Sequence, residues 1–264
     1  MGTLMEEISG CLEIRPTKDL LPHEQIMAHN LKRLKEAMLN IGRIVDPILI
    51  DKKTNLIIDG NHRAKVLEII ECPFAPVQTV DYMRKDITVD TWYPSVSLTP
   101  DEIFRLDSVK HEKVDYDAGK DAIDNLKAPL MLMRKDEFYI LNPGTYKLKE
   151  MIEEQNYVLS LLEKTSVDYI AEPDIKAHIE EGNSVFFRRP YTKEEIIRTA
   201  QEHSPFPPKS TRHLVPGRII RLNMKLGWLH RSAEEAEKEM KRTLSSRVYA
   251  GNVRKYYEPV TVIY

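Results

Sequence analysis

The sequence predicts an α+β protein with two domains, each of which mixes helices and strands. In residues 1–95, short apolar segments typical of strands alternate with apolar residues at helical spacing, and the connections are short. The proline-containing stretch at residues 93–98 then separates this part from a region that combines helices with hairpin strands. We therefore place the two domains at residues 1–95 and 96–264.

In the first domain, alternating apolar residues at 12–14 predict a short strand. Apolar residues at helical spacing from Ile26 to Ile41 predict a helix that stops at Gly42. Residues 47–50 and 56–58 predict two strands joined by a hairpin turn at residues 51–55, and a helix follows the second strand. Two further strands are expected at residues 77–82 and 87–92.

In the second domain, Thr99 and the Pro-Asp-Glu that follows it predict a helix start, because Thr is a good N-cap and Pro suits the first helical position. Thr192 and Glu195 form a capping-box pattern at a second start. The other expected elements are a hairpin at residues 131–133 and 138–141, helices at 145–163, 172–181 and 234–242, and strands at 185–187, 218–222 and 257–264.

Composition limits the classes of function. The chain has 264 residues, 39 basic and 41 acidic side chains and a net charge of -2. This balance argues against a general nucleic-acid binder, whose affinity comes largely from neutralising phosphates. There is no apolar run long enough to span a bilayer and no secretory signal pattern, and the two cysteines suit a reducing compartment. We expect a cytoplasmic protein with no membrane partner.

The most informative segment is residues 56–63, Leu-Ile-Ile-Asp-Gly-Asn-His-Arg. A strand that turns into a helix leaves the first helical N–H groups unpaired, and the helix dipole adds partial positive charge there. Gly60 lets the backbone turn, and His62 and Arg63 add hydrogen-bond donors and charge. The segment suits a phosphate group. The alternative is an ordinary turn in which Asp59 or Asn61 only caps the helix.

Three other segments carry candidate groups. Glu24, in a loop before a helix, is either a surface carboxylate or a general base. Trp92, at a strand end, is either part of the core or the apolar wall of a cleft. The loop at residues 204–213 contains three prolines and ends in Lys-Ser-Thr-Arg-His, which is either a solvated basic loop or a site for a carboxylate or phosphate.

Together these segments resemble the ParB/sulfiredoxin superfamily, whose core is similar to residues 18–63. Within it the chain is most similar to the free L-serine kinases, the ADP-dependent archaeal enzyme and its ATP-using relative in bacterial siderophore pathways. The similarity extends through residues 186–195 to about His213, and the tail after Leu214 is longer than in the archaeal enzyme. The resemblance implies a ParB/sulfiredoxin-like first domain and an active site in the cleft between the two domains.

The resemblance also implies a role for each candidate residue. Glu24 corresponds to the glutamate that activates the serine hydroxyl, and Asp59 also lies close to the reacting centre and could hold Mg²⁺. The nucleotide phosphates are expected at Ile58, Asp59, Gly60, Asn61, His62 and Arg63. Serine or its phosphate is expected at Trp92, Lys209, Thr211, Arg212 and His213.

The implied reaction transfers the terminal phosphoryl group of ADP or ATP to L-serine, giving O-phospho-L-serine for a cysteine or siderophore pathway. Phosphoryl transfer depends mainly on positioning and charge stabilisation, which such a set of residues supplies. The archaeal enzyme usually has a second His where this chain has Asn61, so the donor nucleotide is left open. Either a monomer or a homodimer is compatible with the sequence.

Three other functions share parts of this sequence pattern. Sulfiredoxin chemistry needs a cysteine in the phosphate loop, where this chain has Asn61. A ParB-like nucleotide-binding regulatory or DNA-binding protein should carry a helix-turn-helix domain after the first domain, together with a basic surface. A non-catalytic regulator on the kinase fold could have lost Glu24, which this chain keeps.

Overall fold

The computed structural model describes residues 4–106, 109–162 and 165–256, which form two compact units. The first unit combines three segments: the chain up to Leu21, residues Ile26–Tyr82, and the chain from Gly217 onward. The second unit consists of Pro22–Gln25 and Met83–Pro216. These units differ from the two consecutive domains expected at residues 1–95 and 96–264, because the C-terminal segment carries apolar side chains that pack in the first unit.

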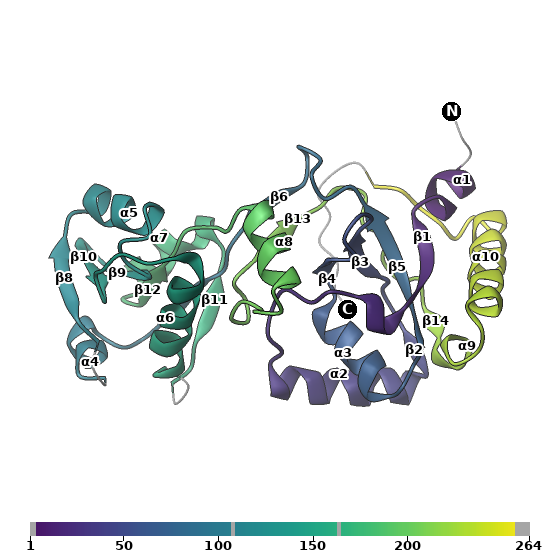
Figure 1. Ribbon diagram of the computed structural model, residues 1–264, viewed down its shortest axis with the longest axis horizontal. Coiled ribbons are helices and arrows are strands. Elements are labelled where there is room, and N and C mark those ends of the chain that lie inside the picture. The colour runs from purple at the N-terminus through teal and green to yellow at the C-terminus, as the bar shows by residue number, and fades with distance from the viewer. Residues whose placement is uncertain (1–3, 107–108, 163–164, 257–264) are drawn as a thin grey trace. The chain divides into compact units, whose positions relative to one another are not determined.

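A four-stranded sheet with the order β1-β5-β3-β4 forms the centre of the first unit (Figure 1). β5 pairs in parallel with β3 and antiparallel with β1, whereas β3 and β4 are antiparallel with a register shift between Leu49 and Ile50. Six of the seven residues of β5 are buried, as expected for a central strand covered on both faces. The strands are β1 (Leu12–Pro16), β3 (Ile48–Asp51), β4 (Ile57–Asp59) and β5 (Phe74–Val80).

The helices of the first unit come from the N-terminal part of the chain, before Tyr82, and from the C-terminal segment after Gly217. The predicted stop at Gly42 is confirmed, since this residue takes the left-handed conformation (φ 64°) directly after α2. α10 begins with a capping box between Ser232 and Glu235 and packs beside β1. The helices are α1 (Leu4–Ser9), α2 (Ala28–Ile41), α3 (Asn61–Ile69), α9 (Leu226–Leu229) and α10 (Ala233–Tyr249), with a 3-10 turn at Thr17–Asp19.

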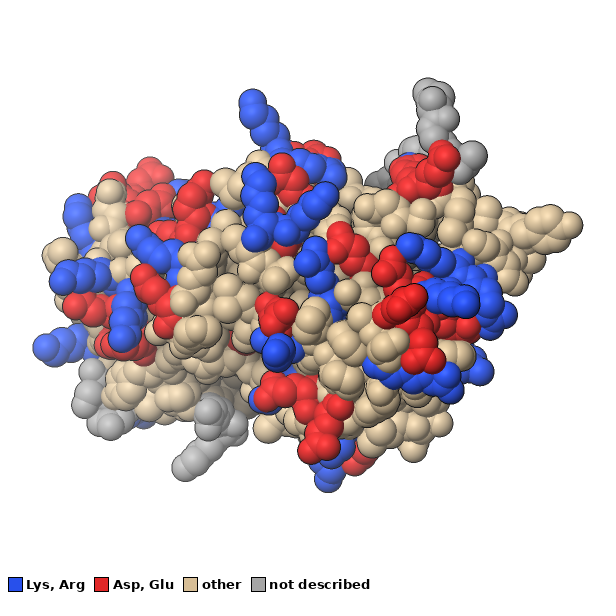
Figure 2. Space-filling model, turned by 45° about the vertical axis from the view of Figure 1, so that its right-hand side comes forward, with Lys and Arg blue, Asp and Glu red and all other residues tan. Residues whose placement is uncertain are grey.

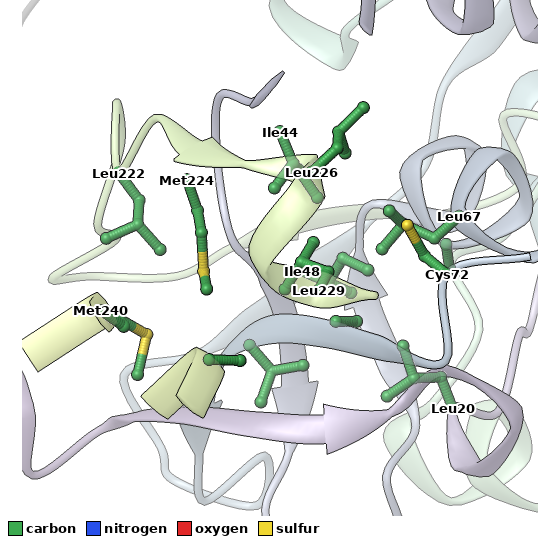
Figure 3. Close-up of a cluster of buried hydrophobic side chains, with 14 of the residues drawn as sticks. Leu20, Ile44, Ile48, Leu67, Cys72, Leu222, Met224, Leu226, Leu229 and Met240 are labelled. Carbon is green, nitrogen blue, oxygen red and sulfur yellow. The ribbon is translucent and has the colours of Figure 1, made fainter. Parts of the chain in front are cut away.

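The C-terminal segment completes the core of the first unit (Figure 3). Leu222, Met224 and Leu229 are buried in the same cluster as Ile48 and Leu67 from the N-terminal part of the chain. The short strand β14 (Met224–Lys225) also pairs with β2 (Arg43–Ile44). The core of the first unit therefore combines side chains that precede Tyr82 with side chains that follow Gly217.

The second unit is built on a six-stranded antiparallel sheet with the order β11-β7-β12-β9-β10-β8. A ParB-type DNA-partition protein was expected to carry a helix-turn-helix domain at this place in the sequence, and the observed architecture is different. The strands are β7 (Tyr93–Val96), β8 (His111–Val114), β9 (Leu130–Arg134), β10 (Glu137–Leu141), β11 (Asp168–Ile170) and β12 (Ser184–Phe187).

Each face of this sheet carries an apolar cluster. Along β9, Met131 and Met133 belong to one apolar cluster and Leu130 and Leu132 to another, as the alternation of side chains along a strand requires. A separate two-stranded ladder joins β6 (Thr88–Asp90) to β13 (Arg212–Leu214). The helices are α4 (Pro100–Phe104), α5 (Tyr116–Asp124), α6 (Leu148–Ser160), α7 (Ile175–Glu180) and α8 (Lys193–Gln201), and a 3-10 turn at Glu172–Asp174 precedes α7.

Most predicted elements are present, including the hairpin of β9 and β10 and the capping boxes at Thr99 and Thr192. The prediction of a strand at residues 218–222 is wrong. There the N–H groups of Ile219 and Arg221 donate to side-chain oxygens of Gln78 and Asp46, so side chains replace a neighbouring strand. The expected strand at residues 257–264 lies outside the described residues.

Other predicted elements differ in length. The strand expected at residues 87–92 is limited to Thr88–Asp90, and the helix expected at 172–181 divides into a 3-10 turn and α7. In the described part of the chain no helix has the length and apolar character needed to cross a membrane. Basic and acidic side chains are interspersed on the face drawn in Figure 2, in keeping with their nearly equal numbers.

Candidate active site

The predicted phosphate loop connects β4 to α3 in the first unit. Gly60 has φ 108°, and a Cβ at this position would lie 3.0 Å from the guanidinium of Arg63, so only glycine suits it. No side chain caps the start of α3, which argues against the interpretation that Asp59 or Asn61 serves only as a cap. The free helix start is the feature that binds anions. Ile58 is 3% exposed, so its side chain belongs to the core and only its backbone can face a ligand.

Asp59 is held by two arginines. Its Oδ2 accepts a hydrogen bond from Nη2 of Arg63 at 2.6 Å and another from Nη2 of Arg218. Burial acts to raise the pKa of Asp59, but the charges and hydrogen bonds of the two arginines outweigh it and lower the pKa. Asp46 lies 3.7 Å from Nη1 of Arg63, so two carboxylates and two guanidiniums balance in charge.

We call residues 58–63 together with Arg218 the Asp59 cluster. Arg218 was missed in the sequence, because it comes 159 positions after Asp59 and lies in the tail that no motif covered. Within the cluster, Nε2 of His62 accepts a hydrogen bond from the backbone N–H of Met27 at 3.3 Å. The side-chain oxygen of Asn61 is buried and has no hydrogen-bond partner in the described ranges.

Glu24 lies in the second unit with the rest of the segment Pro22–Gln25, although the chain on either side of this segment belongs to the first unit. Its backbone pairs with Phe206, because Gln25 N donates to Phe206 O and Phe206 N donates to His23 O, both at 2.8 Å. Its Oε1 accepts from the backbone N of Thr211 at 2.7 Å and from the Thr211 hydroxyl at 2.5 Å. Over residues 4–106, 109–162 and 165–256, neither of these bonds nor any other uses Oε2, which stays available to a ligand.

His23 completes this arrangement and was not predicted to have a role. Its Nε2 is 2.8 Å from the Thr211 hydroxyl oxygen. The Thr211 hydroxyl donates its only proton to Glu24, so it can only accept a hydrogen bond from His23. Nε2 of His23 must therefore carry a proton and donate. The chain of bonds from His23 through Thr211 to Glu24 therefore fixes the orientation of the carboxylate.

Cationic side chains surround Trp92 in the same unit. Nζ of Lys209 lies 5.6 Å and the guanidinium carbon of Arg212 5.2 Å from the centre of the indole ring, within the range of cation–π contacts. Arg212 also pairs with Asp90 at 3.2 Å across the ladder of β6 and β13. His213 lies edge-on to His23, with ring centres 5.3 Å apart.

The structure thus gathers the predicted residues into two clusters, one in each unit. Glu24, Trp92, Lys209, Thr211, Arg212 and His213 form the Thr211 cluster of the second unit. The expected metal ligand Asp59 belongs to the Asp59 cluster of the first unit. No group of three or more His, Cys, Asp or Glu that could hold a metal ion occurs in the described part of the chain.

No family model matches the sequence. An ATP-dependent L-serine kinase of Staphylothermus marinus is 31% identical over 214 residues, which cover 75% of this chain and 82% of the relative. The chain belongs to the L-serine kinase family. The ADP-dependent L-serine kinase of Thermococcus kodakarensis is 27% identical over 78% of this chain and 87% of its own length. The predicted family is therefore confirmed.

A solved structure agrees with the sequence comparison. A free serine kinase mutant in complex with ADP is 25% identical, with a TM-score of 0.72 over 83% of this chain and 94% of that chain. The predicted fold class, a ParB/sulfiredoxin-like α+β protein, is confirmed. This L-serine kinase family member has both clusters described above.

Proposed function

We propose that the protein transfers the terminal phosphoryl group of ATP or ADP to the hydroxyl of free L-serine. The observation that carries the proposal is the fixed orientation of Glu24: two bonds from Thr211 hold Oε1. Thr211 belongs to the same loop as Lys209, whose ammonium lies over the Trp92 ring. A carboxylate held in this way can act as a general base. The relatives of this chain include ATP- and ADP-dependent L-serine kinases.

In the proposed reaction, Oε2 of Glu24 takes the proton of the serine hydroxyl as the serine oxygen forms a bond to the terminal phosphorus. The bond between that phosphorus and the bridging oxygen of the nucleotide breaks, and ADP or AMP leaves. Lys209, Arg212 and His213 would bind the carboxylate of serine and the phosphate of the product. Trp92 would provide an apolar wall for the methylene group.

The Asp59 cluster would bind the phosphates of the nucleotide. The backbone N–H groups at the start of α3 and the guanidiniums of Arg63 and Arg218 all suit phosphate oxygens. The reaction requires the phosphate bound there to reach the hydroxyl at Glu24 during turnover, and this requirement is part of the proposal.

We also propose Mg²⁺ as the cofactor. When bound, it would neutralise charge on the phosphates, and Asp59 is the carboxylate that could hold it. A single carboxylate suits a magnesium ion that shares its other ligands with phosphates and water. Two guanidiniums now bind Asp59. Asp59 could bind the metal once phosphate oxygens accept the hydrogen bonds of these arginines in its place.

The test is direct. The purified protein is incubated with L-serine, MgCl₂ and either ATP or ADP, and O-phosphoserine is measured by ³¹P NMR and mass spectrometry. We expect phosphoserine with at least one donor, none with D-serine, and loss of product when EDTA removes the metal. If neither donor gives phosphoserine, the proposed function is wrong.

A further inference from the structure

Arg188 is a fully buried arginine that the proposed reaction does not use. Its side chain is 0% exposed, and it follows directly after β12. The register pairs Ser184 with Val96 and Val185 with Ser95, so its continuation places Arg188 opposite Trp92. A charged residue at such a position is costly to bury unless hydrogen bonds compensate for the lost water.

The guanidinium joins two separate chain segments through main-chain oxygens. Nε and Nη2 donate to the carbonyl of Trp92 at 3.1 and 2.7 Å, and Nη2 also donates to the carbonyl of Lys209. Nη1 lies 3.4 Å from the Ser210 hydroxyl. A neighbouring bond from the Thr91 hydroxyl to Ser210 O, at 2.9 Å, joins the same two segments.

These bonds set the distance between two side chains that would bind the acceptor. Trp92 and Lys209 face each other at 5.6 Å, and both of their carbonyls are bound by the same guanidinium. The backbone of Lys209 is also in the left-handed region, with φ 63°, which residues other than glycine rarely adopt. A hydrogen bond to its carbonyl helps to hold this conformation.

The charge of Arg188 has no carboxylate partner in the described part of the chain. All four of its hydrogen bonds go to neutral oxygens. Burial lowers the pKa of Arg188, and the nearby Tyr191, Tyr169 and Glu24 oppose this shift. A guanidinium nevertheless stays protonated in proteins. Arg188 therefore adds a buried positive charge next to Trp92 and Lys209 of the Thr211 cluster. This charge favours the binding of an anionic ligand at the cluster.

We propose that Arg188 is a positioning residue for the acceptor: it fixes the gap between Trp92 and Lys209 and supplies a buried charge that favours a carboxylate-bearing amino acid. The proposal rests on the proposed kinase function for the identity of the acceptor. Lysine lacks the planar fork that reaches both carbonyls, so Arg188→Lys removes the geometry that holds the two segments while it leaves a basic side chain in place. Arg188→Met removes both.

The matched control is the next residue. Arg189 is an arginine in the same segment, but it forms an ion pair with Glu195 at 2.7 and 2.9 Å and contacts neither Trp92 nor the Lys209 carbonyl. We expect Arg188→Lys to raise the KM for L-serine about tenfold, the effect of losing one or two charge-assisted hydrogen bonds. The KM for the nucleotide should change little in Arg188→Lys, and both KM values should stay close to wild type in Arg189→Lys.

A spectroscopic measurement tests the geometry without any turnover. The chain has two tryptophans, so Trp228→Phe leaves Trp92 as the only indole. In this background, Arg188→Lys should change the emission of Trp92 in the absence of substrates, and Arg189→Lys should not. If Arg188→Met fails to fold, Arg188→Lys still provides both measurements, with thermal unfolding as the check that it is folded.

The outcomes separate the two proposals. If Arg188→Lys matches Arg189→Lys in both Trp92 emission and serine KM, or if it raises both KM values equally, the positioning role is wrong. If the wild-type protein makes no phosphoserine with either donor, the kinase proposal fails, and the emission measurement in the Trp228→Phe background still decides whether Arg188 positions Trp92.

Discussion

Replacing Glu24 with glutamine tests the proposed base with the smallest change in shape. Oε1 of Glu24 accepts two bonds from Thr211, one from a backbone N–H and one from a hydroxyl. In Glu24→Gln the amide oxygen must keep this place, because an NH₂ group there would face the N–H of Thr211. The amide nitrogen is then forced into the position of Oε2, where it presents hydrogens and cannot accept a proton.

The size of the effect follows from this geometry. A positioned general base contributes about 10²- to 10⁴-fold to the rate, so the barrier should rise by roughly 3–5 kcal/mol. The folded state should lose only about 1 kcal/mol, because both bonds to Thr211 remain in neutral form. We therefore expect kcat for phosphoserine formation to fall by at least about a hundredfold with little change in thermal unfolding.

The assay compares initial rates of Glu24→Gln and wild type at saturating L-serine and nucleotide. Glu102→Gln is the matched control, since Glu102 is an exposed capping-box carboxylate of α4. It should leave kcat unchanged. A kcat for Glu24→Gln within about threefold of wild type would refute the assignment of the base, because the general-base contribution would then be missing. The base role would pass to Asp59.

Two further predictions concern the Asp59 cluster. Arg218→Ala should weaken nucleotide binding about tenfold in calorimetry, because it removes one charge-assisted donor. Arg231 is an exposed arginine of the same unit, so Arg231→Ala is the control and should bind the nucleotide as wild type does. Equal affinities of the two variants would contradict a role for Arg218. The pKa of Asp59 is lowered in the folded protein. The ion pairs of Asp59 therefore stabilise the fold fully above the ordinary pKa of 3.8, and this stabilisation is lost as the pH falls towards the lower pKa of the folded state. The difference in free energy of unfolding between wild type and Asp59→Asn should therefore be constant at neutral pH and shrink below about pH 4, and a difference that grows in acid would contradict this.

Local patterns in the sequence predicted most of the elements and the turn from β4 into α3 well. Gly42, Gly60 and the capping boxes at Thr99 and Thr192 act through neighbours a few residues away, so their consequences can be read from short segments. The link between Glu24 and the loop at residues 209–213 is different. Only the resemblance to a known family indicated it, since the two are about 190 positions apart and no local pattern connects them.

The residues that were missed all act over long distances in the sequence. Arg218 reaches Asp59 across 159 positions, and Arg188 reaches Trp92 across 96. An arginine that binds backbone carbonyls leaves no complementary acid in the sequence, so charge patterns cannot reveal it. The predicted strand at residues 218–222 failed for a related reason, because side chains of Gln78 and Asp46 take the place of a neighbouring strand.

The interleaved order of the chain has a consequence for biosynthesis. The second unit has all its strands once residue 216 has been made, whereas the first unit waits for α10, which packs beside β1 from the start of the chain. During translation the N-terminal sheet therefore remains without part of its core while more than half of the protein is synthesised. Contacts between distant segments form slowly, and exposed apolar strands aggregate in the meantime. A nascent chain that stops before residue 222 should be recognised by chaperones and proteases as incomplete, although its second unit is already folded.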